Sequence, residues 1–149
     1  MNNNEVISIL NGLVETCRRG QEVFRSAAES IRNSEFRRLF NIFSQQRVQF
    51  ISELQGEIHR LGGDGGKAVS STASWPDNTI PFPRSTNTAT FRDEAVIIAE
   101  CQREEEAAVN DYQEALKADL PLDVQYVVKR QYMDIKDAYD RIRILQRAA

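Results

Sequence analysis

Apolar residues recur at intervals of three and four along four stretches of this chain, the spacing that gathers them on one face of an α-helix. The intervals predict helices over about 4–32, 35–61, 91–118 and 121–147. In the first stretch the apolar face consists of Val6, Leu10, Leu13, Val14, Cys17, Phe24, Ala28 and Ile31. The pattern predicts an all-α protein in which the four helices form a single domain over residues 1–149.

Residues that favour helix ends lie at the boundaries of these stretches. Asn4 or a neighbouring asparagine and Ser34 are expected to cap the first two helices, and Thr90 begins a capping box for the third. Gly62 and Gly63 predict a left-handed end to the second helix. Because only two residues separate the first two helices, we expect those helices to be antiparallel neighbours.

A long segment without helical periodicity, over about 62–90, joins the second and third helices. It is rich in Gly, Ser, Thr and Asn, and its three prolines between residues 76 and 83 exclude a helix there. Bundle helices are usually joined by about 2–8 residues, so this connection is expected to return along the bundle and make helices 2 and 3 parallel. Trp75 and Phe82 within it are expected either to pack back on the helices or to contact a partner protein.

Each predicted helix has one polar residue near the middle of its apolar face. In chain order these residues are Gln21, Arg47, Glu105 and Gln131. A shift of the chain by 84 residues superposes the first two of them on the last two, which suggests an internal repeat. We therefore expect the four side chains to lie in one polar layer of the core. A buried Arg47 needs a carboxylate, and Glu105 or the adjacent Glu106 lies at a matching height.

Several short motifs in the helices resemble those of a known bacterial family. They are the segment from Glu5 to Ile31, Gln45-Gln46-Arg47 followed by Glu53-Leu54-Gln55, Arg60-Leu61-Gly62-Gly63, Glu100-Cys101, Asp119-Leu120-Pro121 and Arg130-Gln131-Tyr132. Judged by these motifs, about four-fifths of the chain resembles the ferritin-like family called domain of unknown function 2383. The resemblance implies a ferritin-like four-helix bundle with a long crossover between helices 2 and 3, and it implies no settled activity.

The residues expected at a ferritin-like metal site are missing from the helix patterns. A di-iron site takes one carboxylate from each of two helices and a Glu-x-x-His pair from each of the other two. The one histidine, His59, follows Glu57 by two residues, a step that does not place both on one helix face. We therefore expect no di-iron site and no cofactor. Glu22 and Glu106 stay as candidate ligands of a divergent metal site.

The polar layer has three interpretations. In the first, Arg47 and a carboxylate form a buried ion pair, and Gln21 and Gln131 complete its hydrogen bonds and fix the register of the helices. In the second, the layer lines a small cavity for an anion or a small polar ligand. In the third, the helices are rotated and these side chains face solvent.

Charge and composition narrow the classes of partner. A formal net charge of −3 argues against binding to nucleic acids or anionic membranes. No stretch approaches the ~20 apolar residues of a membrane span, and the first residues do not resemble a secretory signal, so we expect a cytoplasmic protein. Cys17 and Cys101 fall on apolar helix faces and are expected to be buried small hydrophobic residues rather than reactive thiols.

Three functions are compatible with these patterns. We favour a non-catalytic ferritin-like bundle that acts through protein contacts, as a homo-oligomer formed on residual apolar helix faces. The alternatives are a divergent metal-binding or redox bundle that uses Glu22, Glu106 and nearby carboxylates, and a carrier of a small ligand held around Arg47. The sequence identifies no catalytic residue.

Overall fold

The apolar stretches form four helices in the computed structural model, which describes residues 1–63 and 93–148. They are α1 (Asn3–Ser30), α2 (Ser34–Arg60), α6 (Glu94–Leu116) and α7 (Leu122–Ala148). The residues between and around these helices that the structure describes form no strand, and the predicted all-α class is confirmed. None of the four described helices is long and apolar enough to cross a membrane.

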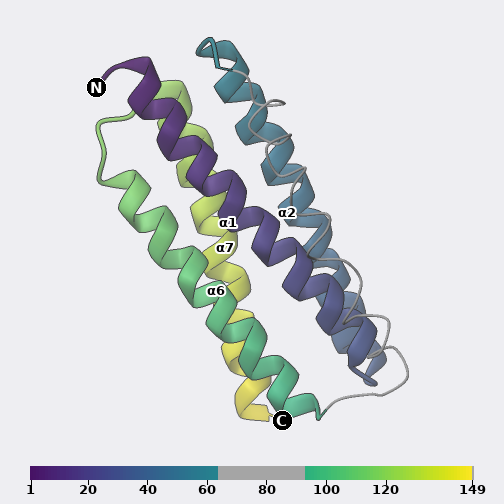
Figure 1. Ribbon diagram of the computed structural model, residues 1–149. Coiled ribbons are helices and arrows are strands. Elements are labelled where there is room, and N and C mark those ends of the chain that lie inside the picture. Colours follow the sequence, from purple (N-terminus) through teal and green to yellow (C-terminus); the bar gives the residue numbers. More distant parts are fainter. Residues whose placement is uncertain (64–92, 149) are drawn as a thin grey trace.

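The four helices lie side by side as a bundle (Figure 1). α1 and α7 run from top to bottom in Figure 1, whereas α2 and α6 run from bottom to top. The neighbouring pairs are α1–α2, α6–α7, α1–α6 and α2–α7, so α2 and α6 lie diagonally across the core. α2 ends at the opposite end of the bundle from the start of α6, and the predicted parallel arrangement of these two helices is confirmed.

Asparagine side chains cap the first two helices. Asn2 caps α1 in a reciprocal box, in which Glu5 N donates to Asn2 Oδ1 and Asn2 N donates to Glu5 Oε1, both at 2.9 Å. For α2 the cap is Asn33, whose side chain accepts from the backbone N–H groups of Glu35 and Phe36. The prediction of Ser34 as this cap was therefore wrong by one residue, because Ser34 is already helical.

α6 begins at Glu94, three residues later than the predicted residue 91. Its cap is Asp93, whose Oδ1 accepts from Ala95 N at 3.2 Å. A carboxylate at this position also suits the positive end of the helix dipole. Thr90, the predicted start of the capping box, lies outside the described residues.

The end of α2 requires the two glycines that follow it. Gly62 has φ of +93°, a left-handed conformation that strains any residue with a Cβ atom. Gly63 N donates to Ile58 O at 2.9 Å, and a Cβ on Gly63 would lie 2.8 Å from Ile58 Cγ2. The predicted glycine end of this helix is confirmed.

Two apolar clusters fill the core, one on each side of a polar level in the middle of the bundle. The larger includes Leu10, Leu13, Leu54, Ile58, Tyr112 and Val128, and the other includes Phe24, Phe40, Phe43, Ile98 and Ile142. Arg47 and Glu105 are buried. Along its own helix, each of them lies between residues of one cluster and residues of the other. The core therefore positions a charged pair at the level where ferritin-like bundles place their ligands.

The buried face of α6 carries small residues. Ala108 and Ala115 are buried, whereas Val109 and Leu116 are half-buried and Ala95 is exposed. Small residues on this face allow α6 to pack closely against its neighbours, and the larger side chains cover the edge of the core.

Candidate functional site

Arg47 lies in the middle of α2, on the apolar face between Phe43 and Phe50, and its side chain is only 1% exposed. Gly20 of α1 provides space for this side chain. A Cβ on Gly20 would lie 3.6 Å from both Cγ and Nε of Arg47, so the glycine backbone is packed directly against the arginine. The Arg47 side chain therefore packs inside the core in the space that Gly20 leaves.

The guanidinium of Arg47 forms a buried ion pair across the diagonal of the bundle. Its Nη2 donates to Oε2 of Glu105 on α6, whose side chain is 0% exposed. Its Nη1 donates to Gln46 Oε1 at 3.0 Å. The Arg47 Cζ atom also lies 5.3 Å from the ring centroid of Phe24 and 5.8 Å from that of Phe50. An ion pair and two cation–π contacts together replace much of the lost hydration.

Burial controls the acidity of Glu105. It raises the pKa of this carboxyl from 4.5 to about 7, even though the charge and hydrogen bond of Arg47 favour ionisation. The second carboxyl oxygen, Oε1, has no hydrogen-bond partner among the described residues, so one half of the carboxylate loses its solvation without compensation. The pair is therefore fully charged only above neutral pH.

Gln21 does not join this ion pair, contrary to the predicted layer. It is half-buried, and its backbone carbonyl accepts from Ser44 Oγ at 3.2 Å. Successive helix residues point about 100° apart, and the inward position at this height belongs to Gly20. The expected place of Gln21 in the core is therefore taken by a residue with no side chain.

Gln131 is buried but belongs to a separate hydrogen-bonded chain. Tyr112 Oη donates to Gln131 Oε1 at 2.7 Å, and Gln131 Nε2 donates to Glu53 Oε1 at 2.9 Å and to the Phe50 carbonyl at 3.3 Å. Because the tyrosine proton is used in this way, Cys17 Sγ, 3.2 Å from Tyr112 Oη, is the donor in their contact. The polar level therefore consists of two groups rather than one layer.

The series of hydrogen bonds that runs from Tyr112 through Gln131 ends at the partly exposed carboxylate of Glu53. Burial alone would raise the pKa of Glu53, but hydrogen bonds from Gln131 and Arg130 lower it below its ordinary value. Arg130 Nη2 lies 3.0 Å from Glu53 Oε1 and joins α7 to α2 at the surface. Glu53 is thus an ionised acceptor for the buried amide.

Neither cysteine presents a reactive thiol. Burial raises the pKa of the Cys17 thiol to about 11. Burial also raises the pKa of Tyr112 well above its ordinary value. Cys101 is buried in the other apolar cluster. Since the thiolate is the nucleophile of cysteine chemistry, Cys17 is suited to packing and hydrogen bonding near neutral pH.

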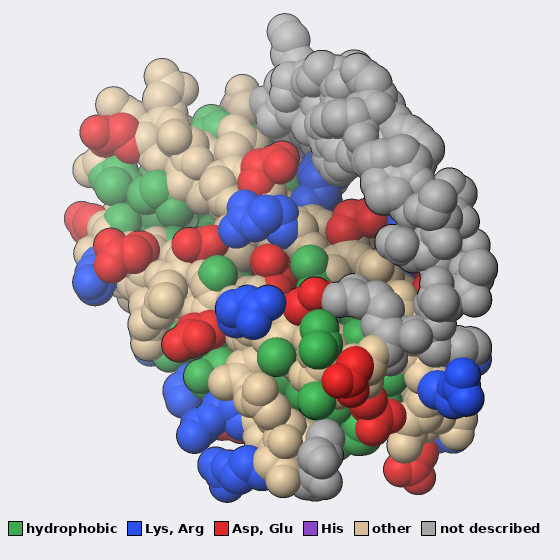
Figure 2. All heavy atoms as spheres, turned by 60° about the horizontal axis from the view of Figure 1, so that its bottom comes forward, with side chains coloured by type: hydrophobic (Ala, Val, Ile, Leu, Met, Phe, Trp, Pro, Cys, Tyr) green, Lys and Arg blue, Asp and Glu red, His purple; other side chains and the backbone are tan. Residues whose placement is uncertain are grey.

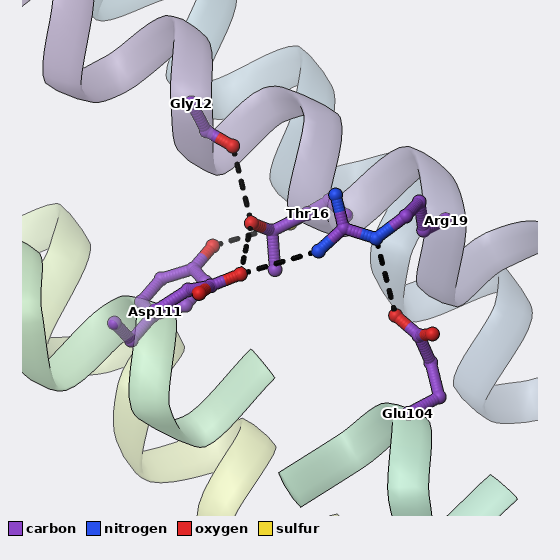
Figure 3. Close-up of polar contacts among 7 residues, drawn as sticks. Gly12, Thr16, Arg19, Glu104 and Asp111 are labelled. Atoms are coloured by element: carbon purple, nitrogen blue, oxygen red, sulfur yellow. Dashed lines mark hydrogen bonds and ion pairs between the residues drawn. The ribbon is translucent and has the colours of Figure 1, made fainter. Parts of the chain in front are cut away.

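A second set of polar residues joins α1 and α6 along the groove between them (Figure 3). Thr16 Oγ1 lies 2.8 Å from Asp111 Oδ2 and 3.1 Å from the Gly12 carbonyl, and its single proton can serve one of them at a time. Arg19 reaches two carboxylates, with Nη2 3.2 Å from Asp111 Oδ2 and Nε 3.8 Å from Glu104 Oε2. Burial raises the pKa of Glu104, and the charge of Arg19 opposes the rise.

This α1–α6 groove is shallow and open. Ile9, Gly12, Leu13 and Ala115 line it on one side of Arg19, and Glu22, Val23, Ala27 and Glu100 line it on the other. The four charged or hydroxyl side chains of Figure 3 bind one another across the groove. Their arrangement supports cohesion of α1 and α6.

A family model described as Domain of unknown function (DUF2383) matches residues 5–118. The chain belongs to this family. Comparison with curated proteins gave no match. The resemblance inferred from the helix motifs is therefore confirmed by the family model, and no activity comes with it.

A solved structure confirms that this DUF2383 chain has a ferritin-like fold. It is the crystal structure of a two-domain protein from Anabaena variabilis that contains DJ-1/ThiJ/PfpI-like and ferritin-like domains. The two share 16% sequence identity with a TM-score of 0.82, and the match covers 99% of this chain. The chain spans only 40% of that protein, and a likeness at this identity shows the fold alone.

The mid-bundle residues of this DUF2383 chain do not fit the metal centre that a ferritin-like fold implies. Gly20 and Arg47 occupy α1 and α2 at that level, and the carboxylate of Glu105 faces a guanidinium. A di-iron centre needs several carboxylates and imidazoles converging on one point. A cation at the guanidinium position would be repelled, and we derive no chemistry through a metal there.

The two surface carboxylates considered as metal ligands lie on different sides of the bundle. Glu22 is exposed and pairs with Arg25 at 2.7 Å. Glu104 faces α1, and Glu106 is two residues further along α6, about 200° around the helix. Within residues 1–63 and 93–148, no group of three potential ligands comes together. His59 is exposed near the end of α2, and Trp75 and Phe82 lie outside the described residues.

Sequence reasoning missed several residues of the polar level. Gly20 carried a usable signal, because a glycine in the middle of an apolar helix face marks a close approach by another group. Tyr112 lies in the core, and a buried tyrosine hydroxyl requires a partner. For Thr16, Arg19 and Asp111 the helical pattern gave no signal, since their contacts depend on how α1 and α6 are rotated.

Proposed function

We propose that this member of the DUF2383 family is a non-catalytic ferritin-like bundle that acts through protein contacts and self-associates through the outer face of α7. One observation carries the proposal. Four large apolar side chains stand exposed in a row on this helix: Leu122 (81% exposed), Tyr126 (69%), Met133 (63%) and Ile144 (62%). We call these four residues the α7 stripe.

The helix period places the α7 stripe on one line. Its members follow one another at steps of 4, 7 and 11 residues, which correspond to about one, two and three turns of an α-helix. The buried side chains of α7, such as Val128 and Ile135, point to the opposite side. The solvent-facing side of α7 therefore carries four exposed apolar side chains, with charged residues such as Lys129 and Asp137 between them.

Four large apolar side chains exposed on one side of a single helix favour a binding role for that side. Scattered apolar residues are normal on a surface, but contiguous ones mark binding sites or carry a risk of aggregation. Methionine and tyrosine are also enriched at protein interfaces. On the face shown in Figure 2, basic side chains are interspersed with acidic ones, and neither sign forms a continuous field. That distribution supports a protein partner over a polyanion.

The interior supports a role without catalysis. The mid-bundle level, where ferritin-like proteins carry their metals, holds the Arg47–Glu105 pair. The raised pKa of Cys17 also disfavours a redox role for its thiol. As part of the proposal the protein is bacterial and works in the cytoplasm, where two unbridged cysteines such as Cys17 and Cys101 are stable.

Light scattering during size-exclusion chromatography tests the proposal. The monomer has a mass of 17.0 kDa, and we expect a species of about twice that mass at concentrations of about 10–100 µM. Met133→Glu places a charge in the middle of the α7 stripe and should return the protein to the monomer mass. The matched control is Ile42→Glu, which changes an equally apolar residue that is 53% exposed on α2, and it should leave the association intact.

Two results would count against the proposal. A wild-type protein that stays monomeric throughout this range has no self-association to explain. Association that survives Met133→Glu but is lost with Ile42→Glu would place the interface on α2.

A further inference from the structure

We infer that two copies of this chain pair through α7 in an antiparallel arrangement, with the twofold axis passing beside Met133. The inference deepens the proposed function and rests on it. It specifies the partner as a second copy and fixes the register of the two helices. It follows from the positions of the apolar and charged residues on the exposed side of α7.

Three members of the α7 stripe, Leu122, Met133 and Ile144, are spaced symmetrically about Met133. Leu122 and Ile144 each lie 11 residues from Met133. When two such helices run antiparallel about Met133, Leu122 of one copy meets Ile144 of the other at both ends. Met133 meets its own counterpart in the middle, so apolar side chains face apolar side chains at three levels.

One pair of opposite charges on the same face is also symmetric about Met133. Lys129 and Asp137 are both exposed, and each lies four residues from Met133. The antiparallel register therefore places a lysine opposite an aspartate, twice per dimer. Lys129 has no ion-pair partner among the described residues, and Asp137 pairs with Arg141 of its own helix at 3.3 Å. A carboxylate has two oxygens and accepts from more than one cation.

Of two further pairs that this register brings together, one is complementary and one joins like charges. Tyr126 and Asp140 each lie seven residues from Met133, so the phenol can donate to the carboxylate across the interface. Arg130 and Lys136 each lie three residues from Met133 and carry the same charge. The side chain of Arg130 is held at the α2–α7 edge by Glu53, which reduces its contact with a lysine of the partner.

Other arrangements of the two helices match charge and apolarity less well. In a parallel pair every residue meets its own counterpart, so Lys129 and Asp137 would each face a like charge. An antiparallel pair shifted by one turn in one direction would place Leu122 opposite Asp140 and Tyr126 opposite Lys136. A shift in the other direction would place Lys129 opposite Arg141. The register centred on Met133 avoids these contacts.

Disulfide cross-linking measures this register. Two facing helices about 8–10 Å apart bring residues on the twofold axis to a Cα–Cα separation of about 4–5 Å, which a disulfide can span. Met133→Cys in the full chain should therefore form a covalent dimer under mild oxidation. Leu122→Cys and Ile144→Cys should each fail to link with themselves, but an equal mixture of the two should form a covalent heterodimer. Cys17 and Cys101 are buried and serve as internal controls in the unchanged chain.

Charge exchange gives a second, independent readout. Lys129→Asp and Asp137→Lys should each weaken dimerisation by at least about tenfold, because each places like charges opposite each other twice. The double variant Lys129→Asp/Asp137→Lys restores opposite charges and should return the dissociation constant to within about threefold of the wild-type value. Arg38→Asp, the same type of change at an exposed position on α2, is the control and should have no effect.

The outcomes separate this inference from the proposed function. Self-linking at residues 122 and 144 would show a parallel pair and overturn the register, as would a light-scattering dimer in which Met133→Cys does not link. Failure of the double charge variant to recover would also overturn it. A wild-type chain that is monomeric by light scattering would instead overturn the proposed function itself.

Discussion

At the scale of single residues, Arg47 is a buried charge whose loss of hydration is offset by several contacts. A guanidinium stays protonated inside a protein, so the residues around Arg47 have to compensate its charge. The ion pair with Glu105, the hydrogen bond to Gln46 and the rings of Phe24 and Phe50 provide that compensation. Glu105 is the partner that can change charge.

The titration of Glu105 predicts how stability depends on pH. Between pH 4.5 and about 7 the folded chain keeps a proton on Glu105 that the unfolded chain has already lost. The free energy of unfolding should therefore fall as pH rises through this window, by up to about 1.4 kcal/mol per pH unit from this group alone. The stabilising contribution is fully present below pH 4.5 and lost above about 7.

Glu105→Gln isolates this contribution. The variant keeps the shape and an oxygen acceptor for Arg47 but does not titrate, while the opposite effect of Glu53, with its lowered pKa, is common to both proteins. Urea denaturation of the two proteins between about pH 5 and 8 should give curves of stability against pH that diverge. Parallel curves would show that Glu105 has its ordinary pKa in the fold.

At the scale of helices, the two ends of α2 show which interactions determine where a helix begins and ends. The apolar pattern predicted the helix but could not distinguish Ser34 from Asn33 as its cap, since both side chains accept hydrogen bonds. The structure assigns the cap to Asn33, which accepts from Glu35 N at 2.9 Å and from Phe36 N at 3.1 Å. At the other end, Gly62 is required by its left-handed backbone and Gly63 by its close packing against Ile58, and the sequence predicted this glycine end correctly.

Two single variants test the corrected cap. Asn33→Ala removes an acceptor for two backbone N–H groups and should lower the free energy of unfolding by about 1 kcal/mol. Ser34→Ala, the control one residue later, should change it by no more than a few tenths of a kcal/mol. The measurement is urea denaturation followed by circular dichroism. A larger loss for Ser34→Ala than for Asn33→Ala would return the cap to Ser34.

The difference between a pattern within one helix and a contact between helices explains how much of the site the sequence predicted. The positions of Arg47 and Glu105 followed from helical periodicity, which is a property of each helix alone. Gln21 was misplaced because a shift of 84 residues aligned it with Glu105, whereas packing selected its neighbour Gly20. The contacts of Tyr112 with Cys17 and Gln131 depend on the rotation of three helices together, which no single-helix pattern specifies.

At the scale of the whole molecule, a charged level divides the core, and an apolar line occupies one outer face. The Arg47–Glu105 pair lies between two apolar clusters and joins the diagonal helices α2 and α6. A buried pair of this kind contributes little net stability compared with apolar residues, but it penalises any packing that separates its partners. The pair thus favours one packing of the helices, and the α7 stripe is the surface that we propose for contacts with a partner.

The central claim is that Arg47 and Glu105 are paired inside the bundle, and a double-mutant cycle tests it most directly. We would measure urea denaturation at about pH 8 for Glu105→Leu, Arg47→Met and the double variant. Glu105→Leu leaves a buried charge that cannot be neutralised and should cost about 3–5 kcal/mol. Arg47→Met should cost less, because Glu105 can take up a proton. The double variant should be more stable than Glu105→Leu alone. Small and strictly additive losses from the two single variants would contradict the pairing and place both side chains in solvent.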